Sequence, residues 1–411
     1  MKLFKKTACR RPTLYGWLIL LGFFGFAGYF IISHLAGFLT VNKPVKAQTM
    51  IIEGWLPDYA LEHAIEIYKR DHYKHLIVTG IPLHQWKSIA NYESMAEVTT
   101  HNIQKLGFHD TIFQASIPHN VLRDRTYSTA LVSKMIFEEH PDWEKAFNIY
   151  SLGVHSRRSR LMFKKAFGEE YRIGVFAEKD ISYDAKHWWR SSRGFRSVSS
   201  EIFSYIFVRL FFHPDPEQYI SKIKKGLYVD SVMRHRAEVE KEFADTAATP
   251  LDSLYFQEHY APPNYYPVKP EYRVKAHFTV DTTGEIFEMA TNTSRKPRYR
   301  VYGYFDFKIH DTSLRLTAYR NVDFLDDPEY GQNLFVPFRD SSNGKTTYEA
   351  GRYIDVLIPH SDTVFLDFNK AYNPYCAYSE RWSCPLVPFE NWLEITIPAG
   401  EKKYFENKGR H

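Results

Sequence analysis

Charge is missing from one long stretch near the start of the chain. Residues 14–39 contain no Asp, Glu, Lys or Arg, and a run of about 20 apolar residues is enough to cross the hydrocarbon layer as a helix. The residues before this stretch carry Lys and Arg but no acidic side chain. Because positive residues stay on the cytoplasmic side, the pattern predicts a cytoplasmic tail (1–13), a transmembrane helix (14–39) and an exported remainder.

A cleaved signal peptide is the competing interpretation. The apolar core of such a peptide is typically about 7–15 residues and is followed closely by a small-residue cleavage site. Here the apolar core is longer, and the nearest passable site, 45–47, lies several residues beyond its end. The length favours an uncleaved signal-anchor: a single pass through a bacterial inner membrane, with the bulk of the chain in the periplasm or otherwise outside the cytoplasm.

Cysteine is also scarce, at three residues. Cys376 and Cys384 fall on the predicted outer side, where disulfides persist. A bond between them would close a short loop and stabilise the fold by about 2–3 kcal/mol in the chain-entropy picture. The alternative is half of a metal site, which would need a nearby His or a second Cys pair. The spacing favours the disulfide and predicts no metal.

An excess of basic residues is absent from the exported part. The net charge is +5, and much of this comes from the cytoplasmic tail, so nothing indicates nucleic acid as a partner. Aromatic residues are abundant, at 17%. That content suits β-rich packing and is compatible with carbohydrate contact.

Residues 45–212 are predicted to form an α/β domain. Between residues 48 and 177, short apolar strands alternate with helical stripes such as the one over 59–73. Continuous apolar strands that alternate with helices are typical of a parallel sheet covered on both faces. The predicted strands are 49–54, 75–80, 111–115, 147–153 and 172–177.

The candidate site lies where these strands end, because ligands of such sheets bind outside the carboxyl ends of the strands. His155 and Arg158 begin a helix after the fourth strand, where cations and free N–H groups favour an anion. His155 is a candidate acid/base or, alternatively, a core residue. The glycines that end the first two strands either contact ligand or permit tight turns. The strand-end set is Glu53, Gly54, Trp55, Gly80, Glu93, Arg125, Thr126, Tyr127, His155, Arg157, Arg158 and Arg160.

The segments EGWLPDYALEHA, YESMAE, DRTYSTA and GVHSRRSRLMFKKAFG resemble the SanA/YdcF/ElyC family of bacterial envelope proteins. The resemblance implies a Rossmann-like fold, often behind one membrane helix, and a role in envelope integrity or surface polysaccharide. The family's hallmarks fall here on Gly54, Glu93, Thr126, His155 and Arg158. The chain departs from the commonest pattern at 53–55, where a Gly-rich turn is usual.

The C-terminal part has a different pattern. A linker helix is predicted within 213–250, and residues 251–411 contain eight alternating apolar segments separated by turn residues. Eight evenly spaced short strands predict a mainly antiparallel barrel or sandwich. The eighth of these segments is 392–398.

The motifs LDFNKAYNPYCAY, CPLVPFENWLEI and IPAGEK resemble a bacterial family known only as a domain of unknown function. The resemblance begins near residue 233 and implies a fold but no activity. Arg352, Asp367 and Asn369 belong to a polar set near strand ends. These residues are candidates for a site in the β-domain or, alternatively, hold turns and ion pairs.

Three hypotheses follow. In the leading one, the α/β domain binds or acts on an anionic or sugar-containing envelope ligand, either a polysaccharide or a lipid-linked precursor. His155 is then the acid/base, Glu93 its carboxylate complement and Arg158 the anion clamp, while Gly54, Gly80 and Thr126 contact the ligand. The rivals are a non-enzymatic envelope scaffold and a hydrolase housed in the β-domain. The sequence predicts no particular cofactor and no oligomeric state.

Overall fold

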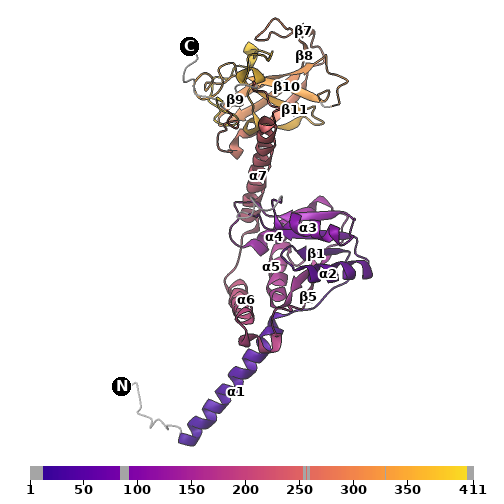
Figure 1. Ribbon diagram of the computed structural model, residues 1–411, viewed down its shortest axis with the longest axis vertical. Coiled ribbons are helices and arrows are strands. Elements are labelled where there is room, and N and C mark those ends of the chain that lie inside the picture. Colours follow the sequence, from indigo (N-terminus) through magenta and orange to yellow (C-terminus); the bar gives the residue numbers. More distant parts are fainter. Residues whose placement is uncertain (1–12, 84–91, 253–255, 257–259, 329, 405–411) are drawn as a thin grey trace, which may run out of the picture. The chain divides into compact units, whose positions relative to one another are not determined.

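The computed structural model describes residues 13–83, 92–252, 256, 260–328 and 330–404. It comprises two compact units, residues 1–227 and 228–411 (Figure 1). The boundary falls inside one long helix, α7 (Pro216–Ala244), within the linker predicted from the sequence. The predicted cytoplasmic tail lies outside the described residues, apart from Thr13.

The first unit begins with helix α1 (Leu14–Leu39), which is long and apolar enough to cross a membrane. The Thr13 hydroxyl caps the helix by accepting from the Gly16 N–H at 3.2 Å, which satisfies one of the free N–H groups of the first turn. Most side chains of α1 are exposed, but Ala36 and Leu39 are fully buried against the rest of the unit. The C-terminal end of α1 is therefore packed onto the domain that follows it.

The core of the first unit is a five-stranded parallel sheet in the order β3-β2-β1-β4-β5, which confirms the predicted Rossmann-like α/β fold. Alternate strand residues point to opposite faces. Helices α4 and α5 cover one face, and α2 and α3 cover the other. The bounds are β1 Thr49–Glu53, α2 Asp58–Arg70, β2 His75–Gly80, α3 Met95–Lys105, β3 Ile112–Ser116, α4 Arg125–Glu139, β4 Ala146–Leu152, η1 Gly153–His155, α5 Ser156–Phe167 and β5 Arg172–Glu178.

The strand order places a switch point at the centre of the sheet. The chain builds outward from β1 through β2 to β3, then returns to the other side of β1 with β4. The connections that leave β1 and β4 therefore diverge to opposite faces, and a crevice opens at the carboxyl ends of these two strands.

Two further helices complete the first unit. The short helix η2 (Ala185–Arg190) leads into α6 (Ser192–Leu210), which begins with Ser191 as its N-cap. Both contact α1, and α6 also packs along α5. Val198 and Val208 face inward and are almost completely buried, so one face of α6 closes the core.

The second unit is built on a curled, seven-stranded antiparallel sheet in the order β11-β10-β9-β8-β6-β12, with β7 paired to β8. This agrees with the predicted β-rich, mainly antiparallel domain. Its core is formed by apolar residues of these strands and of the segment near residue 397. The bounds are η3 Pro270–Tyr272, β6 Arg273–Val280, β7 Ile286–Glu288, β8 Arg298–Ile309, β9 Thr312–Asn321, β10 Asn333–Phe338, β11 Arg352–Leu357, β12 Thr363–Asp367, η4 Phe368–Lys370, η5 Tyr375–Ala377 and η6 Phe389–Asn391.

The prediction of an eighth strand over 392–398 is wrong, because this segment forms no strand in the structure. Its alternating apolar residues do enter the core, but the segment forms no regular strand pairing. It contacts its neighbour through an isolated bridge between Trp392 and Arg339 and through one further main-chain bond, from the Ser341 N–H to the Ile395 carbonyl at 2.8 Å. The Ile397 N–H donates to the carboxylate of Asp340 at 2.7 Å instead of to a strand carbonyl. A side chain therefore replaces the main-chain partner that a strand would need.

Candidate functional site

A pocket of about 310 Å³ lies at the carboxyl ends of β1, β2 and β4. We call it the main pocket. It opens where the strand order predicts a ligand crevice. Five of the six α/β residues predicted from the sequence to carry the site line it, the exception being Glu93. The lining residues are Glu53, Gly54, Trp55, Thr79, Gly80, Ile81, Met95, Arg125, Thr126, Thr129, His155 and Arg158.

His155 lies between two carboxylates. Its Nδ1 is 2.9 Å from Oε1 of Glu201, and its Nε2 is 3.5 Å from Oε1 of Glu53. Burial alone would lower the pKa of the imidazole, but the two negative charges outweigh it and raise the pKa to about 9. His155 is therefore a cation at neutral pH, which suits it to donate a proton or hold an anion.

Glu53 is a buried anion at the end of β1. Its side chain accepts hydrogen bonds from the hydroxyls of Ser151, at 2.5 Å, and Ser159, at 2.6 Å. Burial raises the pKa of this carboxyl, but the charge of His155 and these hydrogen bonds outweigh burial and lower it overall. A charge this deeply buried is stable only because it is paired and hydrogen-bonded.

The second carboxylate, Glu201, comes from α6. Arg158 donates to its two oxygens, with Nε at 2.8 Å and an Nη at 3.0 Å, in a two-point contact typical of arginine and carboxylate. Burial raises the pKa of Glu201, but hydrogen bonds from His155 and Arg158 lower it to about 2. Glu201 therefore fixes His155, the N-cap of α5, and Arg158, in its first turn, in place.

The start of α4 supplies the third cation. Arg125 and Thr126 form its first turn and line the pocket, and the preceding Asp124 has φ 52° and makes no side-chain cap. The side chain of Asp124 instead accepts from Tyr219 at 2.7 Å. The first turn of α4 thus presents its positive end to the pocket without a capping carboxylate.

Gly54 and Gly80 permit the close approach of the elements around the pocket. A Cβ on Gly54 would lie 2.1 Å from the carbonyl oxygen of Thr79, and one on Gly80 would lie 2.3 Å from the backbone nitrogen of Ala96. Both contacts are with main chain and cannot be relieved by a side-chain rotation. The two glycines are therefore required by packing and line the pocket as well.

Glu93 does not join this pocket, so its predicted role as the partner of His155 needs correction. It precedes Ser94, the N-cap of α3, and its N–H donates to the Glu97 carboxylate at 2.7 Å in a capping arrangement. The carboxylates paired with His155 are Glu53 and Glu201. Glu53 belongs to the predicted strand-end set, whereas Glu201 follows His155 by 46 residues, and no local pattern links the two.

Among the α/β residues that the structure describes, the pocket is therefore lined by three cationic side chains (Arg125, His155 and Arg158) and the carboxylate of Glu53. Glu201, which does not line the pocket, pairs with two of these cations. Trp55 adds an aromatic wall, with its ring 5.1 Å from that of His155. Across the described parts of the chain, no group of three or more His, Cys, Asp or Glu is arranged to hold a metal ion.

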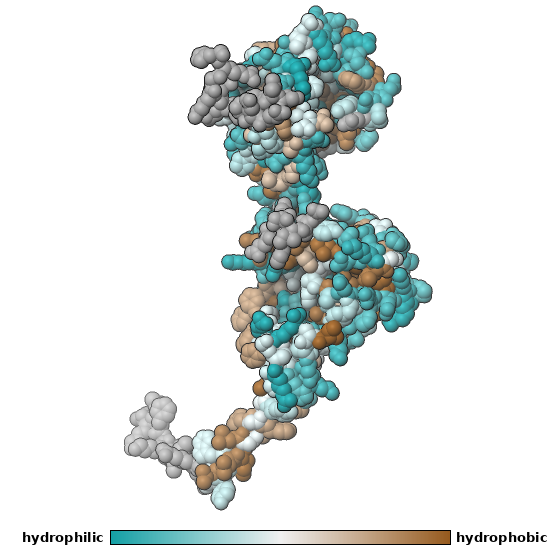
Figure 2. All heavy atoms as spheres, in the orientation of Figure 1, coloured by the Kyte–Doolittle hydropathy of each residue, from teal (hydrophilic) through white to brown (hydrophobic). Residues whose placement is uncertain are grey.

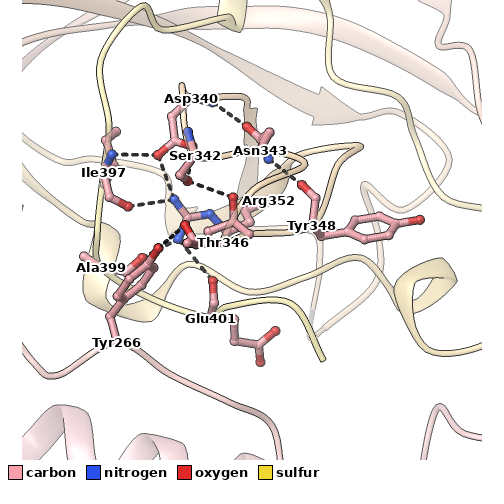
Figure 3. Close-up of polar contacts among 11 residues, drawn as sticks. Tyr266, Asp340, Ser342, Asn343, Thr346, Tyr348, Arg352, Ile397, Ala399 and Glu401 are labelled. Atoms are coloured by element: carbon pink, nitrogen blue, oxygen red, sulfur yellow. Dashed lines mark hydrogen bonds and ion pairs between the residues drawn. The ribbon is translucent and has the colours of Figure 1, made fainter. Parts of the chain in front are cut away.

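The candidates in the second unit do not converge. Arg352 is fully buried and donates to Asp340 at 3.0 Å and to the carbonyl groups of residues 397, 399 and 401 (Figure 3). Asp367 and Asn369 belong to a separate network, in which both bond the hydroxyl of Tyr228. These contacts hold loops against the sheet. That is the role of holding turns and ion pairs that was given for these residues as the alternative to a ligand site.

Cys376 and Cys384 are adjacent in space, and both are free thiols in the structure. The N–H of Cys376 donates to the sulfur of Cys384 at 3.2 Å. The proximity is compatible with the disulfide predicted from the sequence, which stays a prediction.

Comparison with known proteins informs the second unit. Residues 258–402 match the family model described as "Protein of unknown function (DUF1684)", a later start than the resemblance predicted near residue 233. A similar solved structure is the solution NMR structure of the uncharacterized protein from gene locus rrnAC0354 of Haloarcula marismortui. It has 32% identity and a TM-score of 0.36, and the match covers 44% of this chain and 96% of that one. No curated protein matches. Residues 258–402 are thus similar to a family of unknown function.

Proposed function

We propose that this chain is a single-pass, membrane-anchored envelope protein whose α/β unit binds an anionic ligand, such as a phosphate- or sugar-phosphate-containing envelope molecule. The observation that carries the proposal is the charge of the main pocket: among the residues that the structure describes, Arg125, His155 and Arg158 are matched by two carboxylates, Glu53 and Glu201. One positive charge is left over, and a bound anion would neutralise it. The resemblance of the same segments to the SanA/YdcF/ElyC envelope proteins supports this proposal.

The ion pairs of the pocket indicate which of its cations is most available to a bound anion. Glu201 neutralises part of the charge of Arg158 and His155 and fixes their orientation, whereas Arg125 is exposed at the pocket and forms no side-chain ion pair within the described residues. Arg125 is therefore the cation with the most unsatisfied charge. The first turn of α4, which carries it, adds backbone N–H groups that favour the same anion.

If the pocket performs chemistry, His155 is the group suited to it. Its pKa of about 9 keeps a proton on the ring at neutral pH, so it would act as a general acid towards an anionic or leaving oxygen. Glu53, held by Ser151 and Ser159, would stabilise the charged ring. The side chain of Trp55 offers a flat surface on which a sugar ring would pack.

Titration of the purified full chain in maltoside with glycerol 3-phosphate tests the binding proposal. We expect Arg125→Gln to weaken binding by about tenfold or more, because a hydrogen bond to a charged group contributes about 1.5–3 kcal/mol. Arg123→Gln is the matched control, since Arg123 is exposed two residues away and does not line the pocket. The proposal fails if the chain shows no saturable binding or if both variants bind equally well.

The membrane topology has a separate test. An alkaline phosphatase reporter, which is active only outside the cytoplasm, is fused to the C-terminus of the full chain. High activity is expected, together with a band at the size of the uncleaved fusion. An inactive fusion would refute export, and a fusion shortened by about the length of the first 47 residues would indicate signal-peptide cleavage.

A further inference from the structure

A second cavity, of about 440 Å³, lies beside the main pocket and shares Arg125, Thr126 and Arg158 with it. We call it the side pocket. Its remaining walls come from the end of the loop before α4, from α5 and from α6. They are formed by Asp124, Met162, Phe203, Ser204, Phe207 and Val208. The side pocket thus has a cationic wall continuous with the anion site and an apolar wall contributed mainly by α6.

The apolar wall is part of a larger exposed ridge on α6. Its five large side chains are 42–73% exposed. They occupy positions i, i+3, i+4, i+7 and i+8 of α6 and its C-cap, a spacing that aligns them on one face of the helix. The space-filling view shows an apolar patch over the position of α6 (Figure 2). Contiguous apolar surface of this kind marks an interaction site. The ridge consists of Phe203, Ile206, Phe207, Leu210 and Phe211.

With α1 crossing the membrane as proposed, its contacts place helix η2, which precedes α6, at the membrane surface. Counted from Leu14, a hydrocarbon layer of about 30 Å takes up about 20 residues at a rise of 1.5 Å each, and so extends to roughly residue 33. The indole of Trp188 donates to the carbonyl of Ile32 at 2.9 Å, and the ring of Trp189 lies 6.2 Å from that of Tyr29. Both tryptophans therefore sit at the outer boundary, where this residue type is enriched.

The side pocket lies a short distance beyond this hydrocarbon boundary. The ring of Phe38, six residues beyond Ile32, lies 5.8 Å from the ring of Tyr205, and six helical residues correspond to about 9 Å. Tyr205 stands between Phe203 and Phe207 on α6. The apolar wall of the side pocket thus lies at about the depth of the lipid headgroups, which extend several ångströms beyond the hydrocarbon.

We propose that the ligand of these joined pockets is a membrane lipid with an anionic phosphate headgroup and no compensating positive charge. The phosphate contacts Arg125 and Arg158, and the first part of the hydrocarbon chain lies against Phe203 and Phe207. This inference rests on the proposed anion site and adds the apolar half of the ligand. A water-soluble anion would leave the apolar wall in contact with water, whereas a lipid satisfies both walls and is available at the depth where the pocket lies.

Native mass spectrometry of the full chain in maltoside tests the inference with three probes: dioctanoyl phosphatidic acid, glycerol 3-phosphate and dioctanoyl phosphatidylcholine. Phosphatidic acid should bind at least tenfold more tightly than glycerol 3-phosphate, because two methylene groups leaving water account for about that factor. The double variant Phe203→Ser/Phe207→Ser should remove this advantage and leave glycerol 3-phosphate binding unchanged. Arg125→Gln should weaken both.

The substitutions on α6 replace exposed side chains, at 73% and 52% exposure, so the fold should tolerate them. Phe389→Ser, at 78% exposure in the second unit, is the matched control and should change neither affinity. Equal affinities for phosphatidic acid and glycerol 3-phosphate would overturn the lipid inference but leave the anion site standing. Phosphatidylcholine binding as tight as that of phosphatidic acid would also overturn it. Loss of binding of every probe would refute both proposals.

Discussion

Stability of the first unit should depend on pH through His155. Its pKa is raised from an ordinary value of 6.5 to about 9 because Glu53 and Glu201 outweigh burial. A histidine with a raised folded-state pKa adds stability that is fully present below pH 6.5 and is lost as the pH rises through 9. A difference of this size corresponds to about 3 kcal/mol, which His155→Gln should remove at pH 6.

The assay is thermal unfolding of the full chain in maltoside, followed by tryptophan fluorescence between pH 6 and pH 10. For a unit of this size, about 3 kcal/mol corresponds to a difference in Tm of about 6–12 °C. That difference between the wild type and His155→Gln should be largest at pH 6 and nearly absent at pH 10. His109→Gln, at an exposed position, controls for the loss of a histidine. A Tm difference between the wild type and His155→Gln that stays constant from pH 6 to pH 10 would refute the raised pKa of His155.

Three further outcomes are expected. Arg352→Met should destabilise the second unit by about 3–5 kcal/mol, because Asp340 would remain buried without its partner, and denaturant unfolding measures the loss. Gly54→Ala should cost about 1–3 kcal/mol, because its Cβ would meet a β2 carbonyl at 2.1 Å; the Tm of the variant reports it. Thiol titration of the denatured, unreduced chain should find one reactive cysteine if Cys376 and Cys384 are bonded, and three after reduction.

Each of these outcomes has a control. Arg352→Met combined with Asp340→Leu should recover part of the lost stability, and a double variant as unstable as the single one would contradict the ion-pair argument. Gly22→Ala adds a methyl group where nothing lies within 4 Å and should leave the Tm unchanged. Three reactive thiols before reduction would exclude the disulfide in the protein as isolated.

Much of the first unit follows from periodicity. The strands are continuous apolar runs because both faces of the sheet are covered, and that pattern alone is enough to place Gly54, Gly80, Thr126, His155 and Arg158 at one edge. The segment 392–398 shows where the same rule fails. Its residues alternate because they enter the core, but the partner of the Ile397 N–H is a carboxylate from a distant loop, which alternation cannot reveal.

The prediction of Glu93 instead of Glu201 as the carboxylate partner of His155 failed for the same reason, because the contact is made between distant parts of the chain. Both residues lie on or next to a helix near the predicted site, and the sequence offers no measure of which helix turns its carboxylate towards His155. That choice depends on the path of α6, which is fixed by the burial of Val198 and Val208 and by contacts with α1 and α5. Sequence patterns predict faces of helices, but they do not predict which two faces meet.

The position of Glu201 also explains why α6 matters to both halves of the proposed ligand site. Glu201 points inward and holds His155 and Arg158, whereas Phe203, two residues further on, lines the side pocket and is 73% exposed. Residues two apart on a helix point in clearly different directions, so one helix orients the cations and also provides the apolar wall. A lipid bound along that wall would contact the element that sets the charge arrangement of the main pocket, and a change in the seating of α6 would alter both at once.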